Sequence, residues 1–264
     1  MFLQRIILLL SICAVTAIKH CIEPLRTKWV DTCDTPKVKT TFCHGKSCGT
    51  NQQPQTDTCT LVTHSLLADY SVFDIVFLHS GHCQAELSAG DLTEAMTLKA
   101  LPYNENLVGI QINGSELLAA LEHGFDLKHG RGVEEASPRL AGIRFRVSPR
   151  KDYGQRISAP EILSQTCRWR ALDPAQVYNV LTTESLTNGA YRYTELRSGW
   201  PRTDIGIRLT DAFYDHAKSV CEIRDPFRRP KPPSKESTKA TTTSTVNASK
   251  PLYKKKQRTV VASQ

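Results

Sequence analysis

Residues 90–123 read GDLTEAMTLKALPYNENLVGIQINGSELLAALEH, and the elements that they predict indicate the class of the fold. Thr93 precedes a helical pattern that runs to Ala100, and a threonine at an N-cap satisfies backbone N–H groups that a helix leaves free. The apolar run over 106–112 has the length and composition of a strand. Gly114 then opens a second helix with its leucines on one face. Helix, strand and helix in direct succession indicate a domain that mixes both kinds of element.

The same mixture continues on both sides of this stretch. The continuous apolar run over 72–78 is typical of a buried strand, and residues 177–183 form another predicted strand. The further elements that we expect are a short helix over 61–68, a half-buried strand over 142–147 and a helix over 210–220. This order predicts the α/β class with a mixed, α+β type of sheet, and about 160 residues are enough for one core.

The N-terminus has the features of a signal peptide over residues 1–17. Arg5 is followed by the apolar run 6–10, and small residues lead to Ala17. This run is shorter than the 20 or so residues that cross a bilayer, and no later segment is apolar enough to do so. We therefore expect a secreted, extracellular protein without a transmembrane segment.

The cysteine content agrees with export. The chain has nine cysteines, of which Cys13 would leave with the signal peptide. The eight that remain are Cys21, Cys33, Cys43, Cys48, Cys59, Cys83, Cys167 and Cys221. An even number in an exported chain favours disulfides, and no pair has the C-x2-C spacing of a zinc ribbon. About 105 pairings are open to eight cysteines, so spacing does not choose among them.

The net charge of +8 is concentrated in the C-terminal tail, residues 225–264. That segment holds ten Lys and Arg against two acidic residues, whereas the rest of the chain is near neutral. Its Pro, Lys, Ser and Thr content predicts a disordered tail that carries O-glycans. Lys254–Lys256 could contact heparan sulfate or anionic surfaces, the alternative being a simply solvated tail. A basic tail is not a basic domain, so we expect no specific nucleic-acid binding.

These observations divide the chain into a signal peptide over 1–17, a cysteine-rich segment with little regular structure over 18–60, a globular domain over 61–224, and the tail over 225–264. Asn113 and Asn247 begin Asn-x-Ser sequons and are the predicted N-glycosylation sites. We therefore expect a glycoprotein with disulfide bonds.

Several motifs resemble, in order, those of the C-terminal domain of 5'-nucleotidases. Leu101–Tyr103 resembles the family's Leu-Pro-aromatic turn, and residues 177–180 resemble its Val-Tyr-x-Val strand. Further similar segments are the strand entry 141–145, the turn 152–157, and the loop 186–191, which stands where the family has Gly-Gly-Asp-Gly-aromatic. The resemblance covers roughly residues 38–221. It implies a single domain of this kind and a disulfide between Cys43 and Cys48.

The resemblance concerns the substrate-binding half of these enzymes. Their N-terminal half holds two divalent metals through Asp-x-His, Asn-His-Glu and His-x-His motifs, and none of these motifs occurs in this sequence. Two metals are what activates water and holds the phosphate in such a site. The resemblance therefore implies no catalytic residue, no metal ligand and no cofactor on this chain. It implies that the chain would be part of an enzyme only together with a separate metallophosphatase domain.

The binding residues carry over in part. Tyr103 stands at the first aromatic position that stacks the base, and Tyr191, or Tyr193 with a gap, stands near the second. Gly81 and Gly189 match glycines of the two binding loops. Gln84 occupies the position of the phosphate-binding arginine, so the two-pronged contact to phosphate would be lost.

Three functions are therefore open. The leading one is a secreted, hydrolase-like pseudoenzyme that binds a nucleoside, a nucleotide, or a host or self protein. The second is a component of a nucleotide hydrolase in nucleotide catabolism, whose metal domain comes from another chain. The third is a surface-interaction protein that uses the fold as a scaffold and the basic tail for binding. A metal site formed by His79, His82 and Cys83 is less well supported than these three functions, because we expect Cys83 to be in a disulfide.

Overall fold

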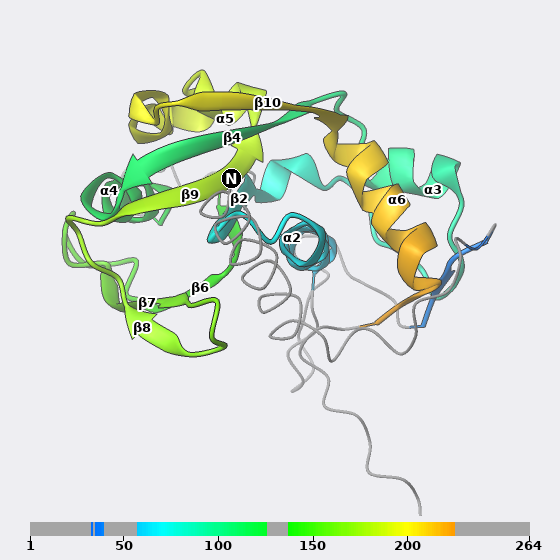
Figure 1. Ribbon diagram of the computed structural model, residues 1–264, viewed down its shortest axis with the longest axis horizontal. Coiled ribbons are helices and arrows are strands. Elements are labelled where there is room, and N and C mark those ends of the chain that lie inside the picture. Colours follow the sequence, from blue (N-terminus) through cyan, green and yellow to red (C-terminus); the bar gives the residue numbers. More distant parts are fainter. Residues whose placement is uncertain (1–32, 34, 40–56, 126–136, 225–264) are drawn as a thin grey trace, which may run out of the picture. The chain divides into compact units, whose positions relative to one another are not determined.

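The computed structural model describes residues 33, 35–39, 57–125 and 137–224, drawn as coloured ribbons in Figure 1. All of them belong to the first of two units into which the chain divides, residues 1–228. The predicted signal peptide, the tail, Cys43, Cys48 and Asn247 lie outside the described residues.

A mixed sheet of five strands forms the centre, in the order β10-β4-β9-β2-β5 (Figure 1). The strands are β2 (Ile75–His79), β4 (Asn106–Asn113), β5 (Pro138–Ala141), β9 (Val177–Thr183) and β10 (Arg202–Arg208). β2 and β9 are parallel, whereas the other neighbours are antiparallel. The predicted mixed sheet is confirmed.

Both faces of this sheet are covered. Val76 and Leu78 point into a core shared with helices α2 (Thr58–Asp69) and α6 (Leu209–Val220). Ile75 and Phe77 point the opposite way, into a core shared with α4 (Gly114–Gly124). Since successive side chains of a strand alternate between faces, a strand covered on both sides is apolar throughout. This is why the run over 72–78 lacks alternation.

The helix start signals act as the sequence predicts. The Thr93 hydroxyl accepts a hydrogen bond from Met96 N at 3.2 Å and caps α3 (Glu94–Ala100). α2 begins earlier than the predicted residue 61, because Asp57 Oδ1 accepts a hydrogen bond from Thr60 N at 2.6 Å. The opposite oxygen of Asp57 accepts from Arg139 Nε at 2.7 Å, which ties the start of α2 to β5.

Glu122 fixes the last turn of α4 to the start of the next sheet. Its carboxylate is buried and accepts hydrogen bonds from the backbone N–H groups of Gly154, Arg156 and Ile157, at 2.8–3.1 Å. The Arg156 guanidinium donates back to the Glu122 carbonyl at 2.9 Å. A buried carboxylate with three donors is well compensated, so this clamp sets the position of the 152–157 turn.

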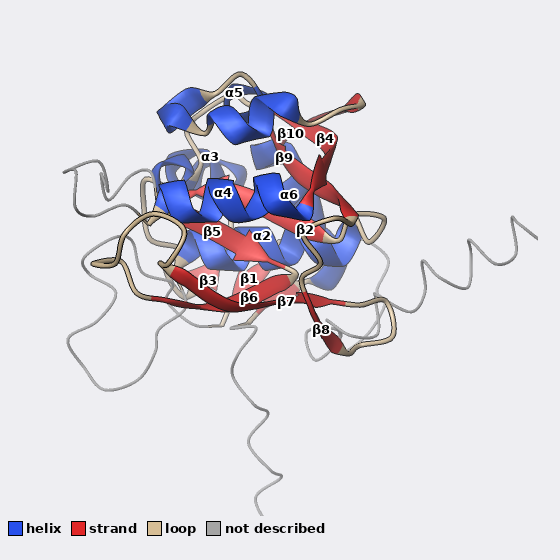
Figure 2. Ribbon diagram, turned by 90° about the vertical axis from the view of Figure 1, so that its left-hand side faces the viewer, coloured by secondary structure: helices blue, strands red, loops and turns tan. Residues whose placement is uncertain are grey.

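Two smaller sheets complete the fold. The strands β6 (Ile143–Val147), β7 (Ile157–Leu163) and β8 (Trp169–Ala171) form an antiparallel sheet, seen along the lower edge of Figure 2. The other sheet has the order β11-β1-β3, from β11 (Glu222–Ile223), β1 (Lys37–Val38) and β3 (Gly90–Asp91). β1 lies within the predicted cysteine-rich segment, and its pairing with β11 joins that part of the segment to the domain.

Disulfides staple these elements, as the even cysteine count predicts. Cys33 is bonded to Cys221 beside β1 and β11, and Cys59 of α2 is bonded to Cys83. Cys167 is also disulfide-bonded. The expectation that Cys83 is in a disulfide is confirmed, whereas the pair Cys43–Cys48 stays a prediction.

Some boundaries differ from the sequence predictions. β2 starts at Ile75, since residues 70–73 form a turn closed by a hydrogen bond from Phe73 N to the Tyr70 carbonyl. The short helical elements that follow β2 and β9 were not predicted. They are η3 (Ser80–His82), α5 (Glu184–Thr187), η5 (Ala190–Arg192) and η6 (Thr194–Ser198).

Candidate functional site

The central sheet brings the predicted binding residues to one of its two ends. Leu107, near the start of β4, pairs with Thr183, the last residue of β9. β2 runs parallel to β9 and ends at the same side. Loops from three separate parts of the chain therefore meet there. We call this end of the sheet, where β2 and β9 end and β4 begins, the η3 end.

Each of the four predicted residues lies in one of these loops. Gly81 is buried in η3, directly after β2. Tyr103 lies in the turn before β4 and is 46% exposed. Gly189 and Tyr191 follow α5, and Tyr191 is 42% exposed. The sequence resemblance and the topology thus select the same end of the sheet.

Backbone geometry explains the glycine and the tyrosine after α5. Gly189 has φ +86°, which strains any other residue, and a Cβ there would lie 2.7 Å from Cδ of Arg197, so a larger residue would also have to displace that side chain. Tyr191 has φ +52°, an uncommon conformation for a residue with a side chain. Its ring lies against the ring of His79, with centroids 4.0 Å apart. Tyr191 is thus held by β2 at the η3 end.

The side chain of Gln84, at the position of the arginine in the family pattern, is hydrogen-bonded within its own loop. Its side-chain amide donates to the Gly81 carbonyl at 2.6 Å, and its backbone N donates to the Ala100 carbonyl at 2.8 Å. The amide closes the loop after β2 on itself. No guanidinium is available at this position to grip a phosphate.

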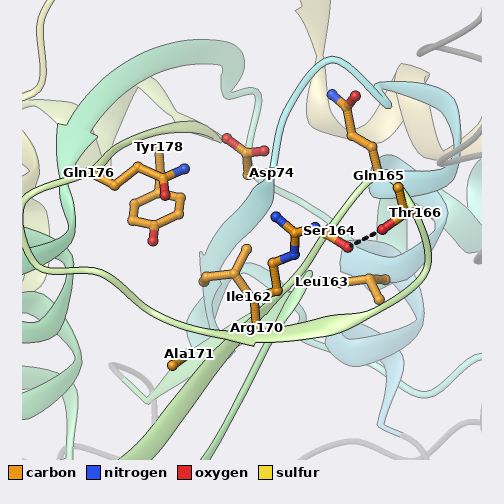
Figure 3. A pocket seen from close by; sticks show the side chains of 10 residues that line it. All are labelled: Asp74, Ile162, Leu163, Ser164, Gln165, Thr166, Arg170, Ala171, Gln176 and Tyr178. Atoms are coloured by element: carbon orange, nitrogen blue, oxygen red, sulfur yellow. Dashed lines mark hydrogen bonds between the residues drawn. The ribbon is translucent and has the colours of Figure 1, made fainter.

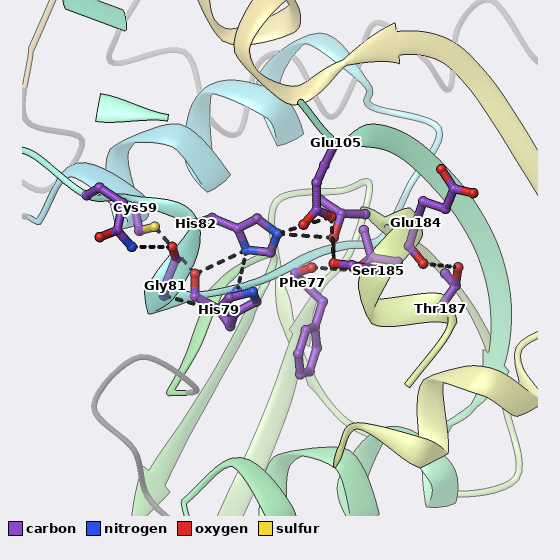
Figure 4. Close-up of polar contacts among 12 residues, drawn as sticks. Cys59, Phe77, His79, Gly81, His82, Glu105, Glu184, Ser185 and Thr187 are labelled. Atoms are coloured by element: carbon purple, nitrogen blue, oxygen red, sulfur yellow. Dashed lines mark hydrogen bonds and ion pairs between the residues drawn. The ribbon is translucent and has the colours of Figure 1, made fainter. Parts of the chain in front are cut away.

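A partly buried polar network lies under these loops (Figure 4). His82 Nε2 is 3.1 Å from Thr183 Oγ1 and 3.6 Å from Glu105 Oε2. The Ser185 hydroxyl donates to the same Glu105 oxygen at 2.6 Å. The network joins η3, the turn before β4 and the start of α5, so it fixes the three loops relative to one another.

Glu105 is ionised in this network. Burial acts to raise the pKa of its carboxyl, but the hydrogen bonds from His82, Ser185 and Thr183 outweigh burial and hold the pKa at about 2. A carboxylate that accepts several hydrogen bonds is a strong acceptor, so Glu105 stabilises the loops as an anion.

The network does not form a nucleophilic or metal centre. The side chain of His82 has no exposed surface, and the hydroxyl of Ser185 donates to Glu105 rather than to a histidine. Cys83 is bonded to Cys59 and has no thiolate to offer. Within the described ranges, no group of three His, Cys, Asp or Glu side chains is arranged to hold a metal.

Glu105, Thr183 and Ser185 were not singled out from the sequence. Thr183 ends β9 and is the N-cap of α5, and Ser185 lies in the first turn of that helix, positions where hydroxyl residues are ordinary. Only the pairing of β4 with β9 shows that the three residues meet. The sequon residue Asn113 is exposed at the N-cap of α4, and its backbone N donates to Glu116 Oε2 at 3.3 Å. It lies at the opposite end of β4.

The model of the family "5'-nucleotidase, C-terminal domain" matches residues 35–197, more than half of the chain. The chain belongs to this family. Among curated relatives, an apyrase of Tabanus yao is 23% identical over 145 residues, which are 53% of this chain and 26% of that protein. A probable 5'-nucleotidase of Treponema pallidum is 25% identical over 152 residues, which are 55% and 26% of the two chains. This 5'-nucleotidase C-terminal domain therefore spans about a quarter of the length of those relatives.

Solved structures agree on the fold. The 5'-nucleotidase precursor of Thermus thermophilus superposes with a TM-score of 0.62 at 22% identity, over 72% of this chain and 37% of that one. The NAD nucleotidase of Haemophilus influenzae gives 0.61 at 17% identity, over 76% and 37%. The predicted family and class are thus confirmed. None of the helices in the described part is long and apolar enough to cross a membrane.

Proposed function

We propose that this chain is a secreted, non-catalytic member of the 5'-nucleotidase C-terminal domain family that binds a nucleoside at the η3 end. The observation that carries the proposal is the meeting of Gly81, Tyr103, Gly189 and Tyr191 in loops at one end of the sheet, with both tyrosines partly exposed. The names of its relatives, apyrase and 5'-nucleotidase, point to nucleotide chemistry.

The chemistry of these loops favours a nucleoside over a nucleotide. Two exposed aromatic rings offer stacking surfaces for a base, which contribute about 1–3 kcal/mol each. The phosphate position lacks its arginine, and the amide of Gln84 is occupied by the Gly81 carbonyl. The ionised Glu105 beneath the loops would repel a phosphate.

The test is isothermal titration of the full chain with adenosine and with AMP. We expect adenosine to bind more tightly than AMP. Tyr103→Ala and Tyr191→Ala should each weaken adenosine binding by about 5- to 100-fold, the loss of one stacking surface. Tyr153→Ala is the matched control, because Tyr153 is an exposed tyrosine on the 152–157 turn.

A phosphate assay on the same mixtures, with divalent metal added, tests the non-catalytic part. We expect no phosphate release from AMP. Release that depends on metal would contradict this part and favour a nucleotide hydrolase. Failure of adenosine to bind, with the control variant behaving as the parent, would reject nucleoside binding and leave protein partners and the basic tail.

A further inference from the structure

A second site lies at the other end of the central sheet, where β2 and β9 begin. A cavity of about 370 Å³ opens there between the β7–β8 hairpin and the first residues of β9 (Figure 3). Ligand cavities in proteins start at about 300 Å³, so this one would hold a small molecule. We call this side of the sheet the cavity end. It is separate from the loops that carry Tyr103 and Tyr191.

Arg170 supplies a positive charge to the cavity. It stands opposite Ile162 in the β7–β8 pairing, so the two side chains lie on the same face of the small sheet, where Ile162 is buried and Arg170 is exposed. In Figure 3 the Arg170 side chain extends from β8 into the cavity. Its guanidinium forms no hydrogen bond or ion pair with any described residue. A guanidinium so placed has five donors to offer to a ligand.

Asp74 supplies a negative charge to the same cavity. Its Oδ2 accepts hydrogen bonds from the backbone N of Asn179 at 2.9 Å and from the Asn179 amide at 3.5 Å. Its Oδ1 receives no hydrogen bond from the described residues. Burial raises the pKa of the Asp74 carboxyl, against the lowering effect of the Asn179 hydrogen bonds. A cationic ligand group beside Oδ1 would offset that burial.

The remaining lining is partly apolar. Ile162 and Leu163 of β7 and Ala171 of β8 give aliphatic surface, and Tyr178 lies at the start of β9. The hydroxyl of Tyr178 accepts a hydrogen bond from Asp173 N at 2.9 Å, so its ring is fixed.

The hairpin wall is preformed. Ser164 N donates to the Arg168 carbonyl at 2.8 Å, and the hydroxyls of Ser164 and Thr166 are 2.9 Å apart. Cys167 at the tip is disulfide-bonded. Because this wall needs no ordering when a ligand binds, less of the favourable contact free energy is offset by lost conformational entropy.

We infer that the cavity binds a small zwitterion, a free α-amino acid with an aliphatic side chain. Arg170 takes the carboxylate through its two-pronged fork, Asp74 Oδ1 takes the ammonium, and the aliphatic lining takes the side chain. A phosphate monoester fits less well, because its second negative charge would face Asp74. This inference is independent of nucleoside binding at the η3 end.

Titration calorimetry of the full chain with three matched probes tests the assignment. L-Leucine carries both charges, isocaproate lacks the ammonium, and isoamylamine lacks the carboxylate. We expect L-leucine to bind at up to millimolar concentration, and each of the other two to bind at least about tenfold more weakly. Inorganic phosphate serves as a fourth probe.

Variants locate the site. Arg170→Gln should weaken L-leucine binding by about ten- to a hundredfold, since it removes a charge-assisted contact. Asp74→Asn should weaken L-leucine but not isocaproate. Arg168→Gln is the matched control, an exposed arginine of the same hairpin that does not line the cavity, and it should bind as the parent does.

Three results would overturn the inference. They are no binding of L-leucine by a folded parent chain, equal binding by Arg170→Gln and the parent, and phosphate binding that Arg170→Gln abolishes while L-leucine does not bind. Adenosine bound at the η3 end should not displace L-leucine, so displacement would place both ligands at one site and also count against a separate cavity.

Discussion

The two ends of the central sheet are built differently. At the η3 end the polar side chains contact one another or the backbone of the loops: His79 lies against Tyr191, Gln84 donates to the Gly81 carbonyl, and Glu105 accepts hydrogen bonds from two loops. At the cavity end the side chains of Arg170 and Asp74 face an open volume, and Arg170 has no partner among the described residues. We infer from this difference that the polar groups of the η3 end chiefly stabilise the loops, whereas Arg170 and Asp74 Oδ1 at the cavity end remain available to a ligand.

The largest effect should come from removing the disulfide that staples the η3 end. Replacing Cys59 and Cys83 together by serine frees a loop of 24 residues and should lower the free energy of unfolding by about 3–4 kcal/mol. Chemical denaturation measures the loss. Amide hydrogen exchange should speed up more in residues 79–84 than in 161–171. Equal acceleration at both places would break the distinction between the two ends.

The next effect is the pH dependence that Glu105 confers. Its pKa in the folded chain, about 2, lies below its ordinary value of 4.5, so its contribution is complete above about pH 5 and declines as the pH falls toward 2. The parent should exceed Glu105→Gln in free energy of unfolding by about 2–3 kcal/mol near neutral pH, and by less at about pH 3. Denaturant titrations at several pH values give both numbers. A difference that stays constant would show that Glu105 is not an ionised anchor.

The smallest effect should be that of Arg170→Gln on stability. Because the guanidinium has no described partner, the free energy of unfolding should change by no more than about 0.5 kcal/mol. The same variant is the one expected to lose L-leucine. A large loss of stability would mean that Arg170 has a structural role, and the contrast between the two ends would then fail.

Features that depend on residues close together in the chain could be predicted from the sequence. The Thr93 cap, the face of α4 that carries Leu117 and Leu121, and the apolar run of β2 depend on neighbours along the chain. The family resemblance also singled out Tyr103 and Tyr191, which lie in two different loops at the η3 end, and their role in binding stays a prediction. Such signals involve residues a few positions apart, and the chemistry of caps and periodicity acts over that range.

Strand pairing was not readable in the same way. β10 and β5 are edge strands with mixed composition, and the alternation of β7 is broken by Ala159, whose φ is +49°. The sequence patterns of edge strands are weak, because one hydrogen-bonding edge of each strand has no partner strand and the other pairs with a segment that is distant in the sequence.

The amino-acid sequence was enough to give the class of the fold, the family and the presence of disulfides. Only the tertiary structure decided which polar side chains meet. The Ser185–Glu105 hydrogen bond joins residues 80 positions apart, and the bonds of Asp74 to Asn179 span 105. The physical reason is that such contacts arise from the register of β4, β9 and β2, which the whole core sets and no local stretch encodes.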